Sequence, residues 1–312
     1  MRNKEKTFVS AVIYMHNSDI RGECFVREIA AFLTEHFENS EIICVNDYST
    51  DNTVQLLRSS AEKIHSTTVT LVNLSYYHGI EMAMNAGDDF AIGDHVFEFD
   101  TVNRDYDFSL VFEAYQKAQE GFDIVSASPE KRQRLSSKIF YRVINHHSGS
   151  TNILGTEAFR LLSRRVINRI KSMSKATPYR KIAYAESGMK SSVISYVPTQ
   201  SELPRTTKEE KKYRFALAVD TLIMFTDIGY KCAVAMTAVM ILIVLAMIIY
   251  SVAVYAMGIA IEGWTTTILF LSIAFFGLFA VLTVIIKYLQ LIIDLVFKRK
   301  HYTFESIEKL TK

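Results

Sequence analysis

The sequence predicts an α/β domain with a mostly parallel sheet, followed by an amphipathic helix and two membrane-spanning helices. Three observations predict this fold class. Short apolar runs alternate with amphipathic helical stretches over the first 130 residues, which is the pattern of a parallel sheet covered by helices. A segment rich in lysine then leads into two long uncharged runs, the first of which begins at residue 232 and ends before Glu262 and the second of which covers residues 263–286. Each run is long enough to cross the ~30 Å hydrocarbon layer of a bilayer.

Length and composition leave room for a sizeable core and exclude several classes of protein. The 312 residues include 35 Lys and Arg against 33 Asp and Glu, a net charge of +2. This balance gives no argument for a nucleic-acid partner. The three cysteines lack the spacing of a disulfide framework or a zinc site. Because the N-terminal residues contain no signal segment, we expect the first domain to stay in the cytoplasm.

Five apolar runs in the first domain are expected to form strands. They cover residues 8–13, 41–45, 68–74, 95–99 and 124–125. Residues 24–37 and 79–92, between these runs, carry apolar side chains on one helical face. Ligands of open sheets bind beyond the carboxyl ends of the strands. Polar residues that directly follow strands are therefore candidates for chemistry.

Glycines in the second of these helical segments have a packing interpretation. Gly87 lies in the middle of the segment, where glycine costs roughly 1 kcal/mol relative to alanine. We therefore expect the helix backbone to approach the sheet closely at Gly87. Gly93 is expected to end the helix as its C′ residue.

The two uncharged runs are predicted to form a transmembrane hairpin. Basic residues flank the hairpin on both sides, whereas the short loop between the runs carries only Glu262. Since positive residues mark the cytoplasmic side, both termini are expected to face the cytoplasm. Residues 208–231 interleave apolar and charged side chains, which favours an amphipathic helix at the membrane surface; an ordinary surface helix is the alternative. The predicted divisions of the chain are residues 1–204, 205–231, 232–287 and 288–312.

Asn17 and Asp47 directly follow the first and second predicted strands. Residues 45–53 join a strand to a helix, and their Ser, Thr and Asp side chains could simply cap that helix. Alternatively, Asp47 could accept hydrogen bonds from a nucleotide base at the strand end. The residues alone leave both interpretations open.

Two acidic residues, Glu98 and Asp100, stand at the end of the fourth predicted strand. Side chains at i and i+2 of a strand point the same way, so both carboxylates should lie together. Such a pair can hold Mg²⁺ or Mn²⁺, which bind few protein oxygens and complete their shell with water and phosphate. A solvated strand end is the alternative.

Basic residues beyond the fifth strand are candidates for binding phosphate. Guanidinium groups match phosphate oxygens in geometry and charge. The alternative is that these basic residues form a solvent-exposed face with no ligand. The candidates are Lys131, Arg132, Arg134 and Arg160. Arg160 is the most specific of them because its neighbours are apolar.

Several of these motifs together resemble inverting family 2 glycosyltransferases. The resemblance rests on residues 10–17, the loop 46–53, the glycine-containing helix 79–94 and the Glu98/Asp100 pair. Residues 134–141 and 159–165, the two apolar runs and the closing basic segment narrow it further. With these features the chain resembles the group of dolichyl-phosphate mannose synthases and bactoprenol glucosyltransferases over nearly its whole length.

This resemblance implies a glycosyltransferase-A fold and a metal-dependent enzyme of the bacterial plasma membrane. The enzyme would move a sugar from a nucleoside-diphosphate sugar, a UDP-linked hexose or N-acetylhexosamine, to undecaprenyl or dolichyl phosphate at the cytoplasmic face. Mg²⁺ or Mn²⁺ would be the cofactor, and a homo-oligomer is left open. The resemblance assigns the following roles: Asn17, Asp47, Lys131 and Arg132 bind substrate, Glu98 and Asp100 hold the metal, and Asp100, Arg134 and Arg160 are catalytic.

The chain also departs from the pattern of that family. Tyr48 stands where the family has glycine, Glu98 is the first acid of the pair, and Val102 replaces a glutamine that contacts the metal. Two other functions stay open, the second of them because of Tyr48 and Val102. One is a transferase that extends a lipid-linked or cell-surface glycan, and the other is a membrane scaffold that has lost turnover.

Overall fold

The computed structural model describes residues 4–130, 141–142, 155–173, 179–199, 208–225, 264–297 and 302–311, with short helical stretches between 235 and 246. The chain divides into two compact units. The first consists of Met1–Leu217 and Arg299–Lys312, and the second of Ala218–Lys298. The first unit contains the sheet and all candidate site residues that the structure describes.

An 8-stranded sheet forms the centre of the first unit. The five predicted strands are present as β1 (Glu5–Met15), β2 (Phe37–Asn46), β3 (Thr68–Leu74), β4 (His95–Phe99) and β5 (Ile124–Pro129). Three further strands, which were not predicted, are β6 (Phe159–Ser163), β7 (Ser191–Tyr196) and β8 (Phe304–Lys309). The strand order is β7-β5-β6-β4-β1-β2-β3-β8. Only β6 and β8 run antiparallel to their neighbours.

Helices cover both faces of the sheet and enclose two apolar cores. On one face lie α1 (Asp19–His36), α2 (Thr53–Ala61) and α4 (Ser109–Gln119), and on the other lie α3 (Ile80–Phe90), α6 (Arg164–Met173) and α7 (Arg180–Glu186). Side chains of β1 alternate between the cores: Ala11 and Ile13 join the first, and Val12 joins the second. The predicted α/β class with a mostly parallel sheet is confirmed.

Gly87 of α3 packs directly on the sheet, as predicted. A Cβ atom at this position would lie 2.3 Å from Cγ1 of Val12 and 2.8 Å from Cγ2 of Val45. The prediction for Gly93 is wrong, because α3 already ends at Phe90 and is capped at Ala91. Gly93 instead passes close to the backbone of Ser10, where a Cβ atom would lie 2.6 Å from the amide nitrogen.

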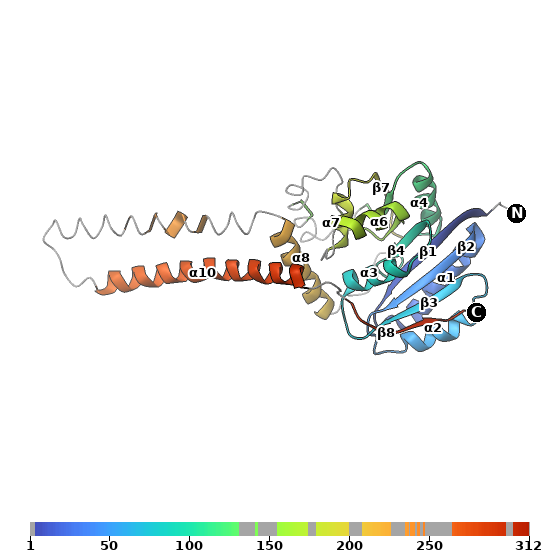
Figure 1. Cartoon of the computed structure of the whole chain (residues 1–312), viewed down its shortest axis with the longest axis horizontal. Helices are drawn as coiled ribbons and strands as arrows, with labels where there is room; N and C mark the ends of the chain where they lie inside the picture. The colour runs from blue at the N-terminus through green and yellow to red at the C-terminus, as the bar shows by residue number, and fades with distance from the viewer. Residues whose placement is uncertain are drawn as a thin grey trace. The chain divides into compact units, whose positions relative to one another are not determined.

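The last strand, β8, comes from the segment predicted to be a tail and pairs antiparallel with β3 (Figure 1). Side chains at and near β8 form further hydrogen bonds with the first unit. Arg58 of α2 donates to both carboxylate oxygens of Glu308, at 2.7 and 3.0 Å, and the Thr311 hydroxyl accepts from the Val69 amide at 2.9 Å. The chain therefore leaves the first unit near Leu217 and re-enters it near Arg299.

Two helices lie over the segments predicted to meet a membrane. α8 (Lys208–Phe225) is helical as predicted, but its charged residues come first and its apolar residues later. Polar and apolar residues are thus separated along α8 rather than around it, and the expectation of an amphipathic helix is corrected.

α10 (Trp264–Phe297) covers the second predicted span. Many of its large apolar side chains are exposed, among them Leu271, Phe275, Phe276 and Phe279. No helix within the described residues combines the length and apolar character needed to cross a membrane. The membrane hairpin and the predicted domain limits stay predictions.

Candidate active site

The strand order brings the candidate residues to one edge of the sheet. β1 lies between β2 and β4 and runs parallel to both, so the carboxyl ends of all three strands meet there. Asn17 follows β1, Asp47 follows β2, and Asp100 follows β4. The connections reverse direction between β1 and β4, which is where open α/β sheets bind their ligands.

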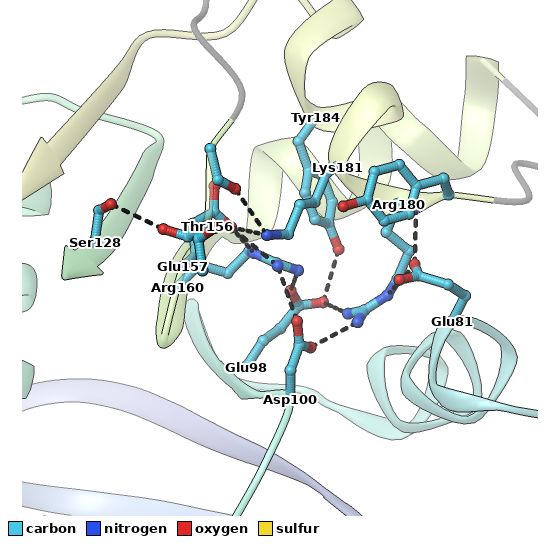
Figure 2. Close-up of polar contacts among 12 residues, drawn as sticks. Glu81, Glu98, Asp100, Ser128, Thr156, Glu157, Arg160, Arg180, Lys181 and Tyr184 are labelled. Carbon is cyan, nitrogen blue, oxygen red and sulfur yellow. Dashed lines mark hydrogen bonds and ion pairs between the residues drawn. The ribbon is translucent and has the colours of Figure 1, made fainter. Parts of the chain in front are cut away.

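Arg160 reaches both predicted acids from the neighbouring strand. It stands directly opposite Glu98 in the antiparallel ladder between β4 and β6. Its Nη1 atom donates to Glu98 Oε2 at 2.6 Å, and its Nη2 atom donates to Asp100 Oδ2 at 3.0 Å (Figure 2). The predicted residues Glu98, Asp100 and Arg160 therefore do lie together, and both acids point to the same side.

A second arginine, Arg180, engages the same two acids from the start of α7. Its Nη1 atom donates to Glu98 Oε1 at 2.6 Å, and its Nη2 atom donates to Asp100 Oδ1 at 2.7 Å. One turn later on the same helix face, the Tyr184 hydroxyl also donates to Glu98 Oε1, at 2.7 Å. Each guanidinium thus bridges both carboxylates, and all four carboxylate oxygens accept hydrogen bonds (Figure 2).

An outer set of charged side chains holds the two arginines in place. Arg160 Nε donates to Glu157 Oε2 at 3.0 Å. Glu81 of α3 accepts from both the Nε atom and the backbone amide of Arg180, at 3.1 and 2.9 Å. Lys181 lies 3.5 Å from Glu157 and adds a third positive charge. The arginine side chains are 2% exposed, Glu98 is 0% exposed and Asp100 is 22% exposed, so solvent reaches this cluster mainly at Asp100.

The arginines set the ionisation of the acids that they contact. Burial alone would raise the pKa of Asp100, but the positive charges of Arg160, Arg180 and Lys181 outweigh it and hold the pKa well below its ordinary value. Burial would also raise the pKa of Glu98, but the positive charges of Arg180 and Arg160 outweigh it, and the pKa of Glu98 is lowered as well. Both carboxylates are therefore ionised at neutral pH and are weak bases.

Asp88 of α3 behaves in the opposite way. Burial and the negative charge of Glu98 raise the pKa of Asp88 well above its ordinary value. The two carboxyl groups share a hydrogen bond, in which the protonated Asp88 donates to Glu98. The Oδ1 atom of Asp88 has no hydrogen-bond partner among the described residues. Asp88 therefore keeps a proton that its ionised neighbours do not.

Replacing Asp88 with asparagine is expected to stabilise the protein increasingly as the pH rises above about 4. A carboxyl whose folded pKa is raised loses stability between its unfolded pKa and its folded pKa, by about 1.4 kcal/mol per unit of difference. Asparagine keeps a donor for Glu98 but does not titrate. Urea unfolding of Asp88→Asn and the native protein across this pH range measures the difference. Asp89→Asn, at an exposed position of the same helix, is the control; equal pH profiles for the two variants would contradict the assignment.

Asp47 and Asn17 form a separate group at the ends of β1 and β2. The Asp47 side chain is 0% exposed and accepts from the amides of His78 and Gly79 at 2.8 and 2.9 Å and from the Tyr14 hydroxyl at 3.1 Å. It thus binds the start of α3 rather than the helix after β2. Asn17 Oδ1 accepts from the Thr50 amide at 2.8 Å. A substrate-binding role for either residue stays a prediction.

Strained and aromatic residues surround the Asp47 group. Tyr48, half exposed, has a φ of 54°, which is uncommon for a residue other than glycine. Such strain persists where the surrounding structure imposes it, and it is frequent at functional sites. Tyr213 of α8 packs on Gly79, where a Cβ atom would lie 2.3 Å from its ring. The first part of α8 therefore contributes to this end of the sheet.

Several site residues were not predicted from the sequence, and others cannot be placed. Lys131, Arg132 and Arg134 lie outside the described residues, so their predicted roles stay predictions. The residues missed were Glu81, Asp88, Glu157, Arg180, Lys181 and Tyr184. Two local signals could have found some of them: the spacing of seven between Glu81 and Asp88 on one helix face, and that of four between Arg180 and Tyr184.

The predicted metal role of Glu98 and Asp100 does not fit this arrangement. Every oxygen that would coordinate a cation already accepts a hydrogen bond from an arginine. In the part of the chain that the structure describes, no group of three or more His, Cys, Asp or Glu side chains is placed to hold a metal ion. The arrangement instead puts two fixed guanidinium groups beside one partly exposed carboxylate.

Comparison with known proteins identifies the family. The family described as glycosyl transferase family 2 matches residues 10–170, which include Asp47, Glu98, Asp100 and Arg160. The match covers more than half of the chain, and the chain belongs to glycosyl transferase family 2. Its fold is accordingly a glycosyltransferase-A-like α/β fold with a mostly parallel, mixed sheet.

Individual relatives are similar over different shares of their length. An uncharacterized glycosyltransferase of Synechocystis is 32% identical over 194 residues, which is 60% of each chain. A prophage bactoprenol glucosyl transferase homolog of Escherichia coli is 26% identical over 61% of this chain and 63% of its own. The chain thus spans less than two thirds of the length of both relatives. A putative glycosyltransferase of Bacillus subtilis is 25% identical over 90% of this chain and 87% of its own.

Among solved structures, a mannosyltransferase from Pyrobaculum calidifontis in complex with GDP-Man and Mn²⁺ superposes with a TM-score of 0.49. The sequence identity is 16%, and the match covers 70% of this chain and 63% of that chain.

Proposed function

We propose that this protein is an inverting glycosyltransferase that moves a sugar from a nucleoside-diphosphate sugar to a polyprenyl phosphate at the cytoplasmic face of a bacterial plasma membrane. A UDP-linked hexose or N-acetylhexosamine is the proposed donor. The observation that carries the proposal is the Arg160 and Arg180 pair beside Asp100, at the ligand-binding edge of a family 2 glycosyltransferase sheet. Likeness to proteins named bactoprenol glucosyl transferase supports the acceptor class.

The ionisation of the acids favours an acceptor that needs no general base. An acceptor hydroxyl must lose its proton, and an efficient base for this has a pKa near the working pH. The pKa values of Glu98 and Asp100 are lowered, so neither acid suits that task. A phosphate monoester has a second pKa of about 6 and is already largely ionised near neutral pH. This difference favours a polyprenyl phosphate over the hydroxyl of a growing glycan.

In the proposed reaction, an oxygen of the acceptor phosphate forms a bond to the anomeric carbon of the sugar. The bond from that carbon to the diphosphate oxygen breaks, so one displacement inverts the anomeric configuration. Negative charge moves from the acceptor to the leaving nucleoside diphosphate. Fixed positive groups that meet this developing charge lower the barrier. Arg160, Arg180 and Lys181 are the described residues suited to this role.

The second unit supports the proposed membrane location. α10 exposes large apolar side chains along much of its length, as a helix surrounded by lipid does. The chain enters and leaves this unit from the same sheet domain, which fits a hairpin that crosses a bilayer twice. Basic residues flank the corresponding sequence on both sides, which favours a cytoplasmic location for both ends.

Incubation of membranes containing the full-length protein with labelled nucleotide sugars and undecaprenyl phosphate tests the proposal. We expect labelled lipid from one nucleotide sugar, and mass spectrometry to identify a sugar–phosphate–polyprenol. Asp100→Asn should lower the rate on the order of 100-fold, whereas Arg27→Met, in an exposed ion pair with Glu23, should not. Sugar added to a pre-existing glycan would favour the extending transferase. The absence of transfer from every nucleotide sugar tested would favour a scaffold.

A further inference from the structure

Two arginines occupy the position at which a family 2 glycosyltransferase with an acidic pair would hold a cation. Arg160 donates to Glu98 Oε2 and Asp100 Oδ2, and Arg180 donates to Glu98 Oε1 and Asp100 Oδ1, at distances between 2.6 and 3.0 Å. The two guanidinium groups together carry two positive charges, as a divalent cation does. Unlike a bound ion, both are attached to the chain.

A divalent cation would have to displace these arginines to reach the acids. Glu98 is fully buried and also accepts from the Tyr184 hydroxyl. Removing one partner from a buried ion pair leaves an uncompensated charge and is strongly destabilising. Mg²⁺ in addition keeps several of its water molecules, for which a fully buried carboxylate offers no room. Asp100 alone is exposed enough to meet an ion from solvent.

We propose that Arg160 and Arg180 take the place of a protein-bound divalent cation, so that this enzyme binds the diphosphate of its donor without a metal held by Glu98 and Asp100. The inference rests on the proposed function and adds to it the means by which the donor is bound. Glu98 then serves as a positioning residue, which fixes the two guanidinium groups.

The geometry leaves both arginines able to bind a further anion. A guanidinium has five N–H donors. Among the described residues, Arg160 donates through Nε to Glu157 and through Nη1 and Nη2 to Glu98 and Asp100, and its Nη2 atom also lies 3.0 Å from Glu157. Arg180 donates through Nε, Nη1 and Nη2 to Glu81, Glu98 and Asp100. The Nη1 atom of Arg160 and both Nη atoms of Arg180 therefore each keep one N–H group that contacts no further described residue. Guanidinium groups bind phosphate oxygens through paired N–H donors.

Metal binding by the protein itself is the first measurement. Purified full-length protein is titrated into Mn²⁺, and the free Mn²⁺ is measured by electron paramagnetic resonance, with the isosteric variant Asp100→Asn as comparison. We expect the native protein to remove no more Mn²⁺ from solution than the variant does. If the native protein binds one Mn²⁺ per chain and Asp100→Asn does not, the inference is overturned.

Nucleotide binding with and without metal is the second measurement. Calorimetry with UDP-glucose, and with GDP-mannose as a second probe, should give a dissociation constant that changes less than about threefold when EDTA replaces Mn²⁺. Arg180→Lys keeps the charge but cannot bridge both carboxylates, and it should weaken binding at least about tenfold. Arg165→Lys, at an exposed position, should leave binding unchanged.

The outcomes separate this inference from the function on which it rests. Binding that is detected only with Mn²⁺ overturns the inference and leaves the proposed transferase in place. If neither probe binds under either condition, the proposed donor class fails and the inference fails with it. The comparison of EDTA with Mn²⁺ uses the native protein, so it decides the matter even if Arg180→Lys does not fold.

Discussion

Replacing Arg180 with methionine is expected to lower the free energy of unfolding by about 3–5 kcal/mol. The variant removes one positive partner from each of Glu98, Asp100 and Glu81. All of these groups except Asp100 are almost fully buried, so water cannot replace the lost arginine. For a unit of this size, the loss corresponds to a melting temperature lower by about 6–20 °C. Urea or thermal unfolding followed by circular dichroism measures it.

Two further variants show whether the charge network causes this loss. Arg27→Met removes an arginine whose side chain is 64% exposed and whose partner Glu23 is 21% exposed, and it should cost less than about 1 kcal/mol. Adding Glu81→Gln to Arg180→Met removes the buried carboxylate whose ion pair with Arg180 has been lost and should recover part of the stability. If Arg180→Met is no more destabilising than Arg27→Met, the two arginines do not form the buried network described above.

The parallel part of the fold could be predicted because its signals are local. Each of the strands β1 to β5 is an apolar run, and the helices between them have one apolar face. Gly87 was also informative on its own, because only close packing on Val12 and Val45 explains a glycine in mid-helix. β6 and β7 were missed because their runs are short and mix polar with apolar residues.

The candidate site was only half predictable for a physical reason. Glu98, Asp100 and Arg160 stand at strand positions that sequence patterns can locate. Arg180 lies 80 residues from Asp100, at the start of a short helix, and its spacing of four from Tyr184 suggests a shared helix face but does not say which acids that face meets. A metal site was predicted because two acids at i and i+2 suggest a cation, and the sequence does not say which cation. The structure places arginines there.

Asp47 contacts a segment that is distant in the sequence, which its local pattern did not predict. The residues after β2 suggested either a cap for the next helix or a ligand contact. The structure instead directs the Asp47 carboxylate to the amides of His78 and Gly79, so it stabilises the start of α3 in the second core. Only the strand order, with β3 beside β2, brings these segments together.

Strand β8 is the part of the fold that the sequence concealed most completely, because its partner β3 is more than 200 residues earlier in the chain. Its six residues include three charged side chains, and isolated they carry no strong strand signal. They protect β3, whose Leu71 and Val72 are fully buried. Without β8, the backbone groups along one side of β3 would have no partner, and an unpaired strand edge promotes association with other chains.

Ending the chain at residue 301 is therefore expected to destabilise the sheet unit by about 3 kcal/mol and to lower its melting temperature by about 6–12 °C. The deletion removes the ladder to β3, the Thr311 contact with the Val69 amide and the Arg58–Glu308 pair. Glu308→Gln in the full chain removes only the exposed ion pair and should cost less than about 1 kcal/mol, so it separates the strand from the charge. Thermal unfolding and light scattering measure stability and association.

The sheet unit alone, residues 1–217, should associate in solution through the uncovered edge of β3. Joining residues 299–312 to it through a flexible glycine–serine linker of about 20 residues should reduce this association. Equal stability and equal association with and without residues 299–312 would show that β8 does not contribute to the stability of the folded unit.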